Sequence, residues 1–119
     1  MLILVAHGSS NARWRDAVEQ LAAAVQAEVG ENAVRLAYMD CSPPSLIDVV
    51  SEAARAGVRE IRVFPLFLVS EGHVERDIRP LVDEVRRVHQ AVNVVLLPPL
   101  GHYRQFRELI CDIAMDRAP

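Results

Sequence analysis

Four short apolar runs, each followed by a segment of helical periodicity, constrain the fold of this chain more than any other feature. Runs of branched apolar residues of this length are typical of buried strands. The segments between them carry apolar residues three and four positions apart, which predicts amphipathic helices. The expected strands are Leu2–Ala6, Ala33–Asp40, Glu60–Val69 and Asn93–Leu97.

The expected helices begin and end at residues that favour helix termini. Any of the polar residues 9–11 can cap the first helix, while Gly30 ends the first helix and Gly57 the second. Pro80 suits the first turn of the third helix, which leaves residues 72–76 as a separate helical turn. The apolar stripes expected to face the core are Trp14, Ala17, Val18, Leu21 and Val25; Leu46, Ile47, Val50 and Ala54; Ile78, Leu81, Val82, Val85 and Val88; and Phe106, Leu109, Ile110 and Ile113.

Alternation of strands and helices indicates one α/β domain over residues 1–119. Strands joined by helical crossovers run parallel, and the helices cover both faces of the sheet. We expect a flavodoxin-like four-stranded sheet with the strand order 2-1-3-4. This order places the first and third strands side by side at the point where ligands bind, beyond the carboxyl ends of the strands.

A histidine follows each of these two central strands. His7 comes directly after the first strand and precedes small turn residues, and His73 follows the third strand after a Ser-Glu-Gly turn signal. A side chain just past a buried strand is held by a rigid scaffold and is open to a ligand. The two histidines are therefore distant in sequence and expected to be close in space.

Two facing imidazoles suit proton transfer and metal binding. A neutral imidazole accepts a proton near neutral pH and is a good ligand for cobalt, iron and nickel. Two histidine ligands leave coordination positions open, so that a metal can be passed on, whereas a structural site would be closed. The alternative for His7 and for His73 is a helix-capping histidine or a satisfied core histidine.

Other polar residues near strand ends have two interpretations each. Asp40 could bind metal or orient a histidine, or it could be a turn residue of the loop. Cys41 is expected to be a small buried hydrophobe rather than a soft metal ligand. His102 is expected to cap the last helix, with a place at the rim of the cleft as the alternative. His89 is expected to close the third helix in a structural role.

Charge and composition narrow the class of protein. The net charge of −3 argues against a general nucleic-acid binder. The apolar start, Met1–Ala6, is too short for a signal peptide, and no segment approaches a membrane span. Cys41 and Cys111 form no paired motif, which favours reduced thiols in a cytoplasmic protein. Together with the charge and the absence of an apolar span, this predicts a protein without a membrane or nucleic-acid partner.

Four short motifs follow or end the expected strands: His7-Gly8-Ser9, Pro65-Leu66-Phe67-Leu68, Gly72-His73-Val74 with Asp77-Ile78, and Leu100-Gly101-His102. Taken together, these motifs resemble the class II tetrapyrrole chelatases in their short form, the sirohydrochlorin cobaltochelatases and related ferrochelatases. The resemblance covers essentially the whole chain. It implies insertion of a divalent metal into a tetrapyrrole, with His7 and His73 as paired metal ligands and His7 also as proton acceptor. It further implies macrocycle contacts from Ser9, from Pro43 and from Leu68, Val69, Ser70, Glu71 and Gly72.

The sequence departs from this family pattern in two loops. Asp40 keeps one carboxylate of the acidic run after the second strand, but Pro43 replaces the other acid. Glu71 takes the place of a small residue before His73. Asp40 and Glu71 are therefore candidate additional metal ligands. The resemblance favours Co²⁺ with sirohydrochlorin, with Fe²⁺ and then Ni²⁺ as alternatives, and no organic cofactor.

The resemblance also implies a homodimer, because relatives of the long form carry two such domains that face each other. Two other functions stay open. A metal or tetrapyrrole carrier would use the same residues without turnover. A histidine-dependent phosphoryl-transfer enzyme usually carries Arg directly before the His-Gly pair, and Ala6 at that position disfavours it.

Overall fold

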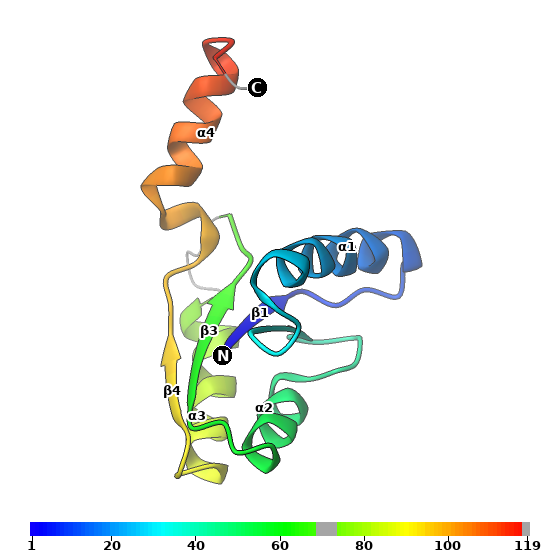
Figure 1. Ribbon diagram of the computed structural model, residues 1–119, viewed down its shortest axis with the longest axis vertical. Coiled ribbons are helices and arrows are strands. Elements are labelled where there is room, and N and C mark those ends of the chain that lie inside the picture. The colour runs from blue at the N-terminus through cyan, green and yellow to red at the C-terminus, as the bar shows by residue number, and fades with distance from the viewer. Residues whose placement is uncertain (69–73, 118–119) are drawn as a thin grey trace.

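A four-stranded parallel sheet forms the centre of the computed structural model, which describes residues 1–68 and 74–117 (Figure 1). The strands lie in the order β2-β1-β3-β4, so the expected flavodoxin-like order is confirmed. The central strand β1 is almost completely buried, because it pairs with a strand on each side and is covered on both faces. The strands are β1 (Leu2–Ala6), β2 (Val34–Tyr38), β3 (Glu60–Pro65) and β4 (Asn93–Leu96).

Helices lie on both faces of the sheet, as the alternating pattern predicts. On one face α2 and α3 pack against Ile3, Val5 and Val63 of the central strands, and on the other α1 packs Ala22 against Leu4. Two short helical turns, η1 (Val74–Ile78) and η2 (Leu100–His102), precede α3 and α4. The helices are α1 (Ala12–Val29), α2 (Leu46–Arg55), α3 (Arg79–Val88) and α4 (Arg104–Ala114).

Local sequence explains where these helices begin and end. The Asn11 side chain accepts a hydrogen bond from the backbone N–H of Arg13 (2.9 Å) and caps α1. Gly30 ends α1 with φ = 104°, a conformation that favours glycine. Pro80 lies in the first turn of α3, where its missing N–H costs no hydrogen bond.

The parallel register brings the carboxyl ends of three strands to one edge of the sheet. Ala6 at the end of β1 pairs with Tyr38 at the end of β2, and Val5 pairs with Pro65 at the end of β3. The hydrogen-bonded ladder continues for one residue beyond the strands, from Met39 N–H to the Ala6 carbonyl (2.8 Å). The residues after β1, β2 and β3 therefore meet at this edge.

The third strand is shorter than its sequence suggests. It ends at Pro65, and the N–H of Leu66 makes the last bond to β1, to the carbonyl of Val5 (2.8 Å). The expected extension through residues 66–68 is wrong because Phe67 leaves the ladder and packs its ring against His7, while Val69 lies outside the described residues.

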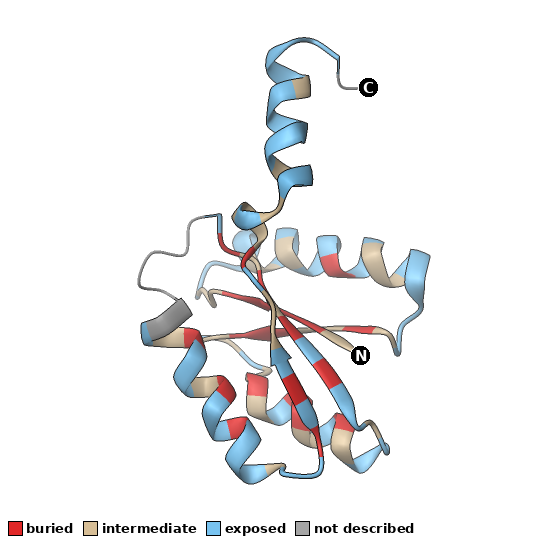
Figure 2. Ribbon diagram, turned by 90° about the vertical axis from the view of Figure 1, so that its left-hand side faces the viewer, coloured by how far each residue is buried: buried red, intermediate tan, exposed pale blue. Residues whose placement is uncertain are grey.

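Two predicted apolar stripes differ from the observed core. In α1 Trp14 and Leu21 are exposed, and the small Ala22 contacts the sheet in their place, because α1 lies close over Leu4 and Val34. In α4 no residue is buried, since the helix projects away from the sheet (Figure 2). The expected core role of its stripe is therefore wrong within this single chain.

Two further expectations fail in loops. Cys41 is exposed rather than buried, because it lies in the turn after β2, where its backbone is left-handed with φ = 59°. The N-terminal cap position of α4 is Tyr103 rather than His102, and no side chain caps this helix. His89 ends α3 as expected, with its Nε2 atom 2.8 Å from Ser51 Oγ, which supports a structural role. In the part of the chain that the structure describes, no helix combines the length and apolarity needed to cross a bilayer.

Tyr38 connects β2 to α1 and makes stability depend on pH. Its side chain is 2% exposed, and its hydroxyl donates a hydrogen bond to Glu19 Oε1 (3.1 Å). Burial first, and then the bond to the carboxylate, raises the pKa of Tyr38 above its ordinary value. Because the pKa is raised in the folded state, this stabilisation is complete below the unfolded-state pKa and is lost as the pH rises through the folded-state pKa.

We expect Tyr38→Phe to lower the free energy of unfolding by about 1 kcal/mol at neutral pH, since one hydrogen bond is lost. Above about pH 10 the variant should lose less stability than the wild type, because it has no phenol at position 38 to ionise. Urea unfolding between neutral pH and about pH 11 measures both effects. Tyr103→Phe is the matched control, and equal pH slopes for wild type and Tyr38→Phe would contradict the assignment.

Candidate active site

His7 stands at the carboxyl edge of the sheet, directly after the buried end of β1. Its side chain is 41% exposed, so it is neither a core histidine nor the cap of α1, which is Asn11. The imidazole packs against the buried ring of Phe67, with 4.7 Å between ring centroids and 33° between ring planes. One side of the ring is therefore held by the core while the side chain keeps contact with solvent.

Asp40, after β2, uses its two carboxylate oxygens differently. Oδ1 accepts a hydrogen bond from the backbone N–H of Gly8 (2.9 Å). Oδ2 lies 4.0 Å from Nδ1 of His7, within ion-pair range although too long for a hydrogen bond. Asp40 thus fixes the turn after His7 and places a negative charge beside the imidazole, which places Nε2 on the opposite side of the ring.

The turn after His7 requires a glycine and is locked to the loop after β2. A Cβ atom at position 8 would overlap with the backbone carbonyl of Asp40, so only glycine fits there. Ser42 Oγ accepts a hydrogen bond from the N–H of Ser9 (3.1 Å) and donates one to the Ser9 carbonyl (2.9 Å). The Ser9 hydroxyl accepts the N–H of Asn11 (3.0 Å), at the start of α1.

The loop after β4 supports the end of β3 from the other side. The N–H of Gly101, in η2, donates to the carbonyl of Phe67 (3.1 Å). A Cβ atom at position 101 would overlap with the carbonyl of Leu68, so the two loops are in close backbone contact. Beyond this contact the Leu68 side chain is 60% exposed, which presents an apolar surface at the edge that carries His7.

The structure brings together only part of the predicted site. His7, Ser9 and Asp40 lie on adjoining turns, with Pro43 exposed on the loop of Asp40 and Leu68 exposed after β3. The remaining predicted residues lie outside the described residues, which resume at Val74 in η1. These are Val69, Ser70, Glu71, Gly72 and His73. Within residues 1–68 and 74–117, no group of three or more His, Cys, Asp or Glu side chains could hold a metal ion.

Three residues that shape this edge are not marked as site residues by the sequence pattern. Phe67 was placed inside a strand, although an aromatic residue near the end of an apolar run after a proline is a signal that could have marked it. Ser42 and Gly101 each fix a neighbouring loop by contacts between segments far apart in sequence. Such contacts leave no periodic signal.

A parallel sheet of order 2-1-3-4 with helices on both faces places the chain in the flavodoxin-like class of α/β folds, and His7 and Asp40 lie at the carboxyl edge of its sheet. Sequence comparison agrees with this class, because the CbiX family matches residues 1–116. The chain belongs to the CbiX family.

Relatives with similar sequences are named sirohydrochlorin cobaltochelatase. That of Methanopyrus kandleri is 37% identical over 78 residues, which are 65% of this chain and 54% of that protein. That of Methanococcoides burtonii is 22% identical over 125 residues, which are 98% of this chain and 92% of that protein. The chain thus matches about half the length of the first relative and nearly all of the second.

Solved structures reproduce the fold. A CbiX protein of cobalamin (vitamin B12) biosynthesis from Marinobacter aquaeolei superposes with a TM-score of 0.84 and 35% identity, covering 98% of this chain and 92% of that chain. The sirohydrochlorin chelatase SirB from Bacillus subtilis, in complex with cobalt, gives a TM-score of 0.82 and 16% identity. It covers 97% of this chain and 49% of SirB, so this chain spans about half of that protein.

Substitutions of Asp40 separate its two roles. Asp40→Asn keeps an oxygen acceptor for Gly8 and removes the charge beside His7, whereas Asp40→Ala removes both. We expect Asp40→Ala alone to lose about 1 to 2 kcal/mol of unfolding free energy. Both variants should weaken Co²⁺ binding about tenfold or more, as loss of a group that orients a metal-binding histidine does.

Urea unfolding and calorimetric titration with Co²⁺ measure these effects. Asp83→Asn, which removes a carboxylate from α3, is the control and should bind Co²⁺ as the wild type does. If Asp40→Asn also binds Co²⁺ with wild-type affinity, Asp40 serves only as an acceptor for the backbone.

Proposed function

We propose that this protein inserts a divalent metal ion, with Co²⁺ as its preferred substrate, into sirohydrochlorin. The observation that carries the proposal is the half-exposed His7 imidazole, held between Phe67 and Asp40 at the carboxyl edge of a CbiX-family domain. Relatives of this chain are named sirohydrochlorin cobaltochelatase, and the Bacillus subtilis chelatase SirB was crystallised with cobalt. Fe²⁺ and then Ni²⁺ are the alternative metals.

The proposed reaction exchanges one metal ion for two protons. The two pyrrole N–H groups of the macrocycle lose their protons, and the nitrogen lone pairs bind the metal. His7 accepts one of these protons, because a neutral imidazole is suited to that role near neutral pH, and the other proton passes to water. Asp40 Oδ2 lies 4.0 Å from Nδ1 of this imidazole. No electrons and no chemical group are transferred, so we propose no organic cofactor.

Before insertion the same imidazole serves as a metal ligand. We propose His73 as the second histidine ligand, with Asp40 and Glu71 as further candidate ligands. Such a set leaves coordination positions open, which allows the ion to be passed to the macrocycle. Ser9, Pro43 and the segment 68–72 are the proposed macrocycle contacts, and the exposed apolar side chain of Leu68 supports this placement.

The domain of residues 1–119 is proposed to act as a homodimer in the cytoplasm, without a nucleic-acid or membrane partner. A dimer would complete an edge that one chain leaves open around His7. Free, exposed thiols at Cys41 and Cys111 are in keeping with a reducing compartment.

An insertion assay tests the function directly. Purified protein receives sirohydrochlorin with Co²⁺, Fe²⁺ or Ni²⁺ in turn, and the absorbance of the macrocycle reports insertion. We expect a rate above that without protein, and the highest rate with Co²⁺. Glu71→Gly should alter the metal preference if Glu71 binds metal, and an unchanged profile would make it a solvated charge. Stoichiometric binding without turnover would show that the protein is a carrier and not a chelatase.

Histidine variants test the assigned roles in the same assay. We expect His7→Ala and His73→Ala each to lower the insertion rate at least about 100-fold, because a proton acceptor or metal ligand is lost. For His7→Ala, circular dichroism should show a wild-type fold, since the side chain lies outside the core. His89→Ala is the control, because it loses the Ser51 contact and some stability but should insert metal normally. Wild-type turnover in either variant would refute that histidine's role.

A further inference from the structure

The loop after β2 begins with a tight three-residue turn at the edge that carries His7. The N–H of Ser42 donates to the carbonyl of Asp40 (2.7 Å), and Cys41 between them has φ = 59°. A hydrogen bond that closes around one central residue of positive φ defines the rare form of the γ-turn, which is strained for a residue with a side chain. Such a backbone persists only where the surrounding contacts hold it in place.

Two side chains of this turn bind two successive backbone N–H groups after His7. Asp40 Oδ1 accepts the N–H of Gly8 (2.9 Å), and Ser42 Oγ accepts the N–H of Ser9 (3.1 Å). The Ser42 hydroxyl also donates to the Ser9 carbonyl (2.9 Å). One side chain thus uses its donor and an acceptor site on a single residue that lies 33 positions away in the sequence.

These bonds leave His7 between two fixed points of the backbone. Before it, the carbonyl of Ala6 accepts the N–H of Met39 (2.8 Å), which ties the end of β1 to the sheet. After it, the Ser42 hydroxyl holds both the N–H and the carbonyl of Ser9. The backbone of His7 cannot shift far without breaking one of these contacts.

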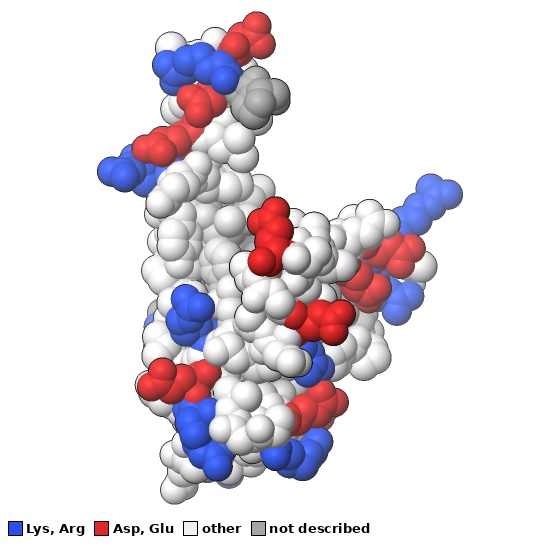
Figure 3. Space-filling model, in the orientation of Figure 1, with Lys and Arg blue, Asp and Glu red and all other residues white. Residues whose placement is uncertain are grey.

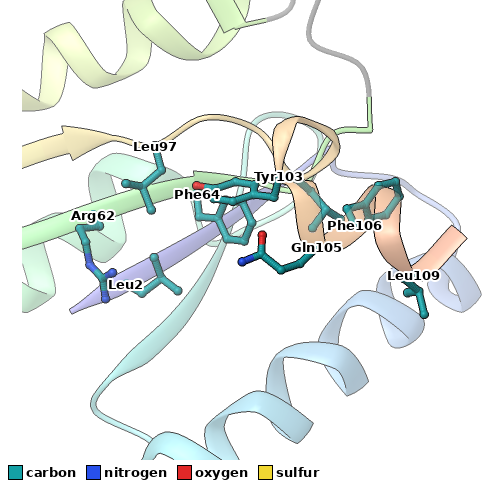
Figure 4. Close-up of a pocket in the computed structure, with 9 residues that line it drawn as sticks. Leu2, Arg62, Phe64, Leu97, Tyr103, Gln105, Phe106 and Leu109 are labelled. Atoms are coloured by element: carbon teal, nitrogen blue, oxygen red, sulfur yellow. The ribbon is translucent and has the colours of Figure 1, made fainter. Parts of the chain in front are cut away.

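An open groove of about 490 Å³ elsewhere on the molecule supplies no metal ligand. The surface between the body and the base of α4 shows few charged atoms (Figure 3). The groove is lined by the sheet and by the base of α4, and its described lining includes no His, Cys, Asp or Glu side chain (Figure 4). The position of a metal ion at the proposed site therefore depends on the turn that carries His7.

We propose that Ser42 is a positioning residue, whose hydroxyl holds the His7 imidazole in the place that metal binding and proton transfer require. The proposal rests on the proposed function for the role of His7 itself. Ser42 acts through the backbone of Ser9 and needs no contact with metal or macrocycle. Loss of a group that orients a metal-binding histidine costs about 10-fold to 100-fold in affinity or activity, and small displacements of a reacting group have effects of similar size.

The ring contact with Phe67 makes the position of His7 measurable without a ligand. The two ring centroids lie 4.7 Å apart, with 33° between the ring planes. The ring current of Phe67 therefore shifts the NMR signals of the carbon-bound imidazole protons by an amount that depends on how the rings are placed. If His7 is displaced, these signals move even in the absence of metal and tetrapyrrole.

Ser45, three residues further along the loop, provides the matched control. Its hydroxyl also accepts a backbone N–H, that of Asp48 (3.2 Å), but this bond caps α2 and does not reach the turn after His7. Ser42→Ala and Ser45→Ala should both lower the urea midpoint, because each variant loses side-chain bonds to the backbone. Only Ser42→Ala should move the His7 ring signals.

Calorimetric titration with Co²⁺ and the insertion assay complete the test. We expect Ser42→Ala to bind Co²⁺ about tenfold or more weakly and to lower kcat for insertion by at least about tenfold. Ser42→Thr keeps the hydroxyl and should stay within about threefold of the wild type in both measurements, as should Ser45→Ala.

Three results would overturn the positioning role of Ser42. The first is a Ser42→Ala variant with wild-type Co²⁺ affinity and wild-type His7 signals. The second is an equal loss in Ser42→Thr, which would show that the hydroxyl is not responsible. The third is an equal loss in Ser45→Ala, which would assign the effect to stability alone. A wild type without turnover would refute the proposed function instead, and the His7 signals of Ser42→Ala would still decide the role of Ser42.

Discussion

The site depends on one constraint, the complete enclosure of β1 within a parallel sheet. β1 has a hydrogen-bonded strand on each side and apolar layers on both faces, so Ile3 to Ala6 are buried and the next side chain that reaches solvent is His7. Parallel pairing forces β2 and β3 to end at the same edge. His7, Asp40 and Phe67 therefore meet there although they are far apart along the chain. The enclosed strand fixes the position of the imidazole, and the edge gives it access to a ligand.

The residues around His7 are ordered by contacts that need no ligand. Asp40 is held by the Gly8 N–H, Ser42 bonds reciprocally with Ser9, and Phe67 is buried against the core. A metal that binds the imidazole would thus meet a charge already in place, and little further ordering would be required.

The sequence pattern was sufficient for the strands, their parallel direction and, through the switch-point rule, the place of His7 and Asp40. It was not sufficient where contacts between distant segments decide the backbone. The apolar run through Val69 does not reveal that pairing ends at Pro65, because an unpaired Phe67 is as apolar as a paired one. The left-handed backbone at Cys41 is not predictable from the sequence, because the residue at this position is not glycine. The periodicity of α4 predicts an apolar stripe, but periodicity alone does not show which surface covers that stripe.

The two loops around β3 explain how a projecting helix and an active edge can share one small domain. Gly101 lies so close to the Leu68 carbonyl that no larger residue fits, and its N–H bonds to Phe67, which supports the His7 ring. A helix that leaves this junction is therefore in rigid contact with the site through three residues. A shift at this junction would therefore displace Phe67 and change the support of the His7 ring, although the hydrogen bonds that fix the turn after His7 come from the loop after β2.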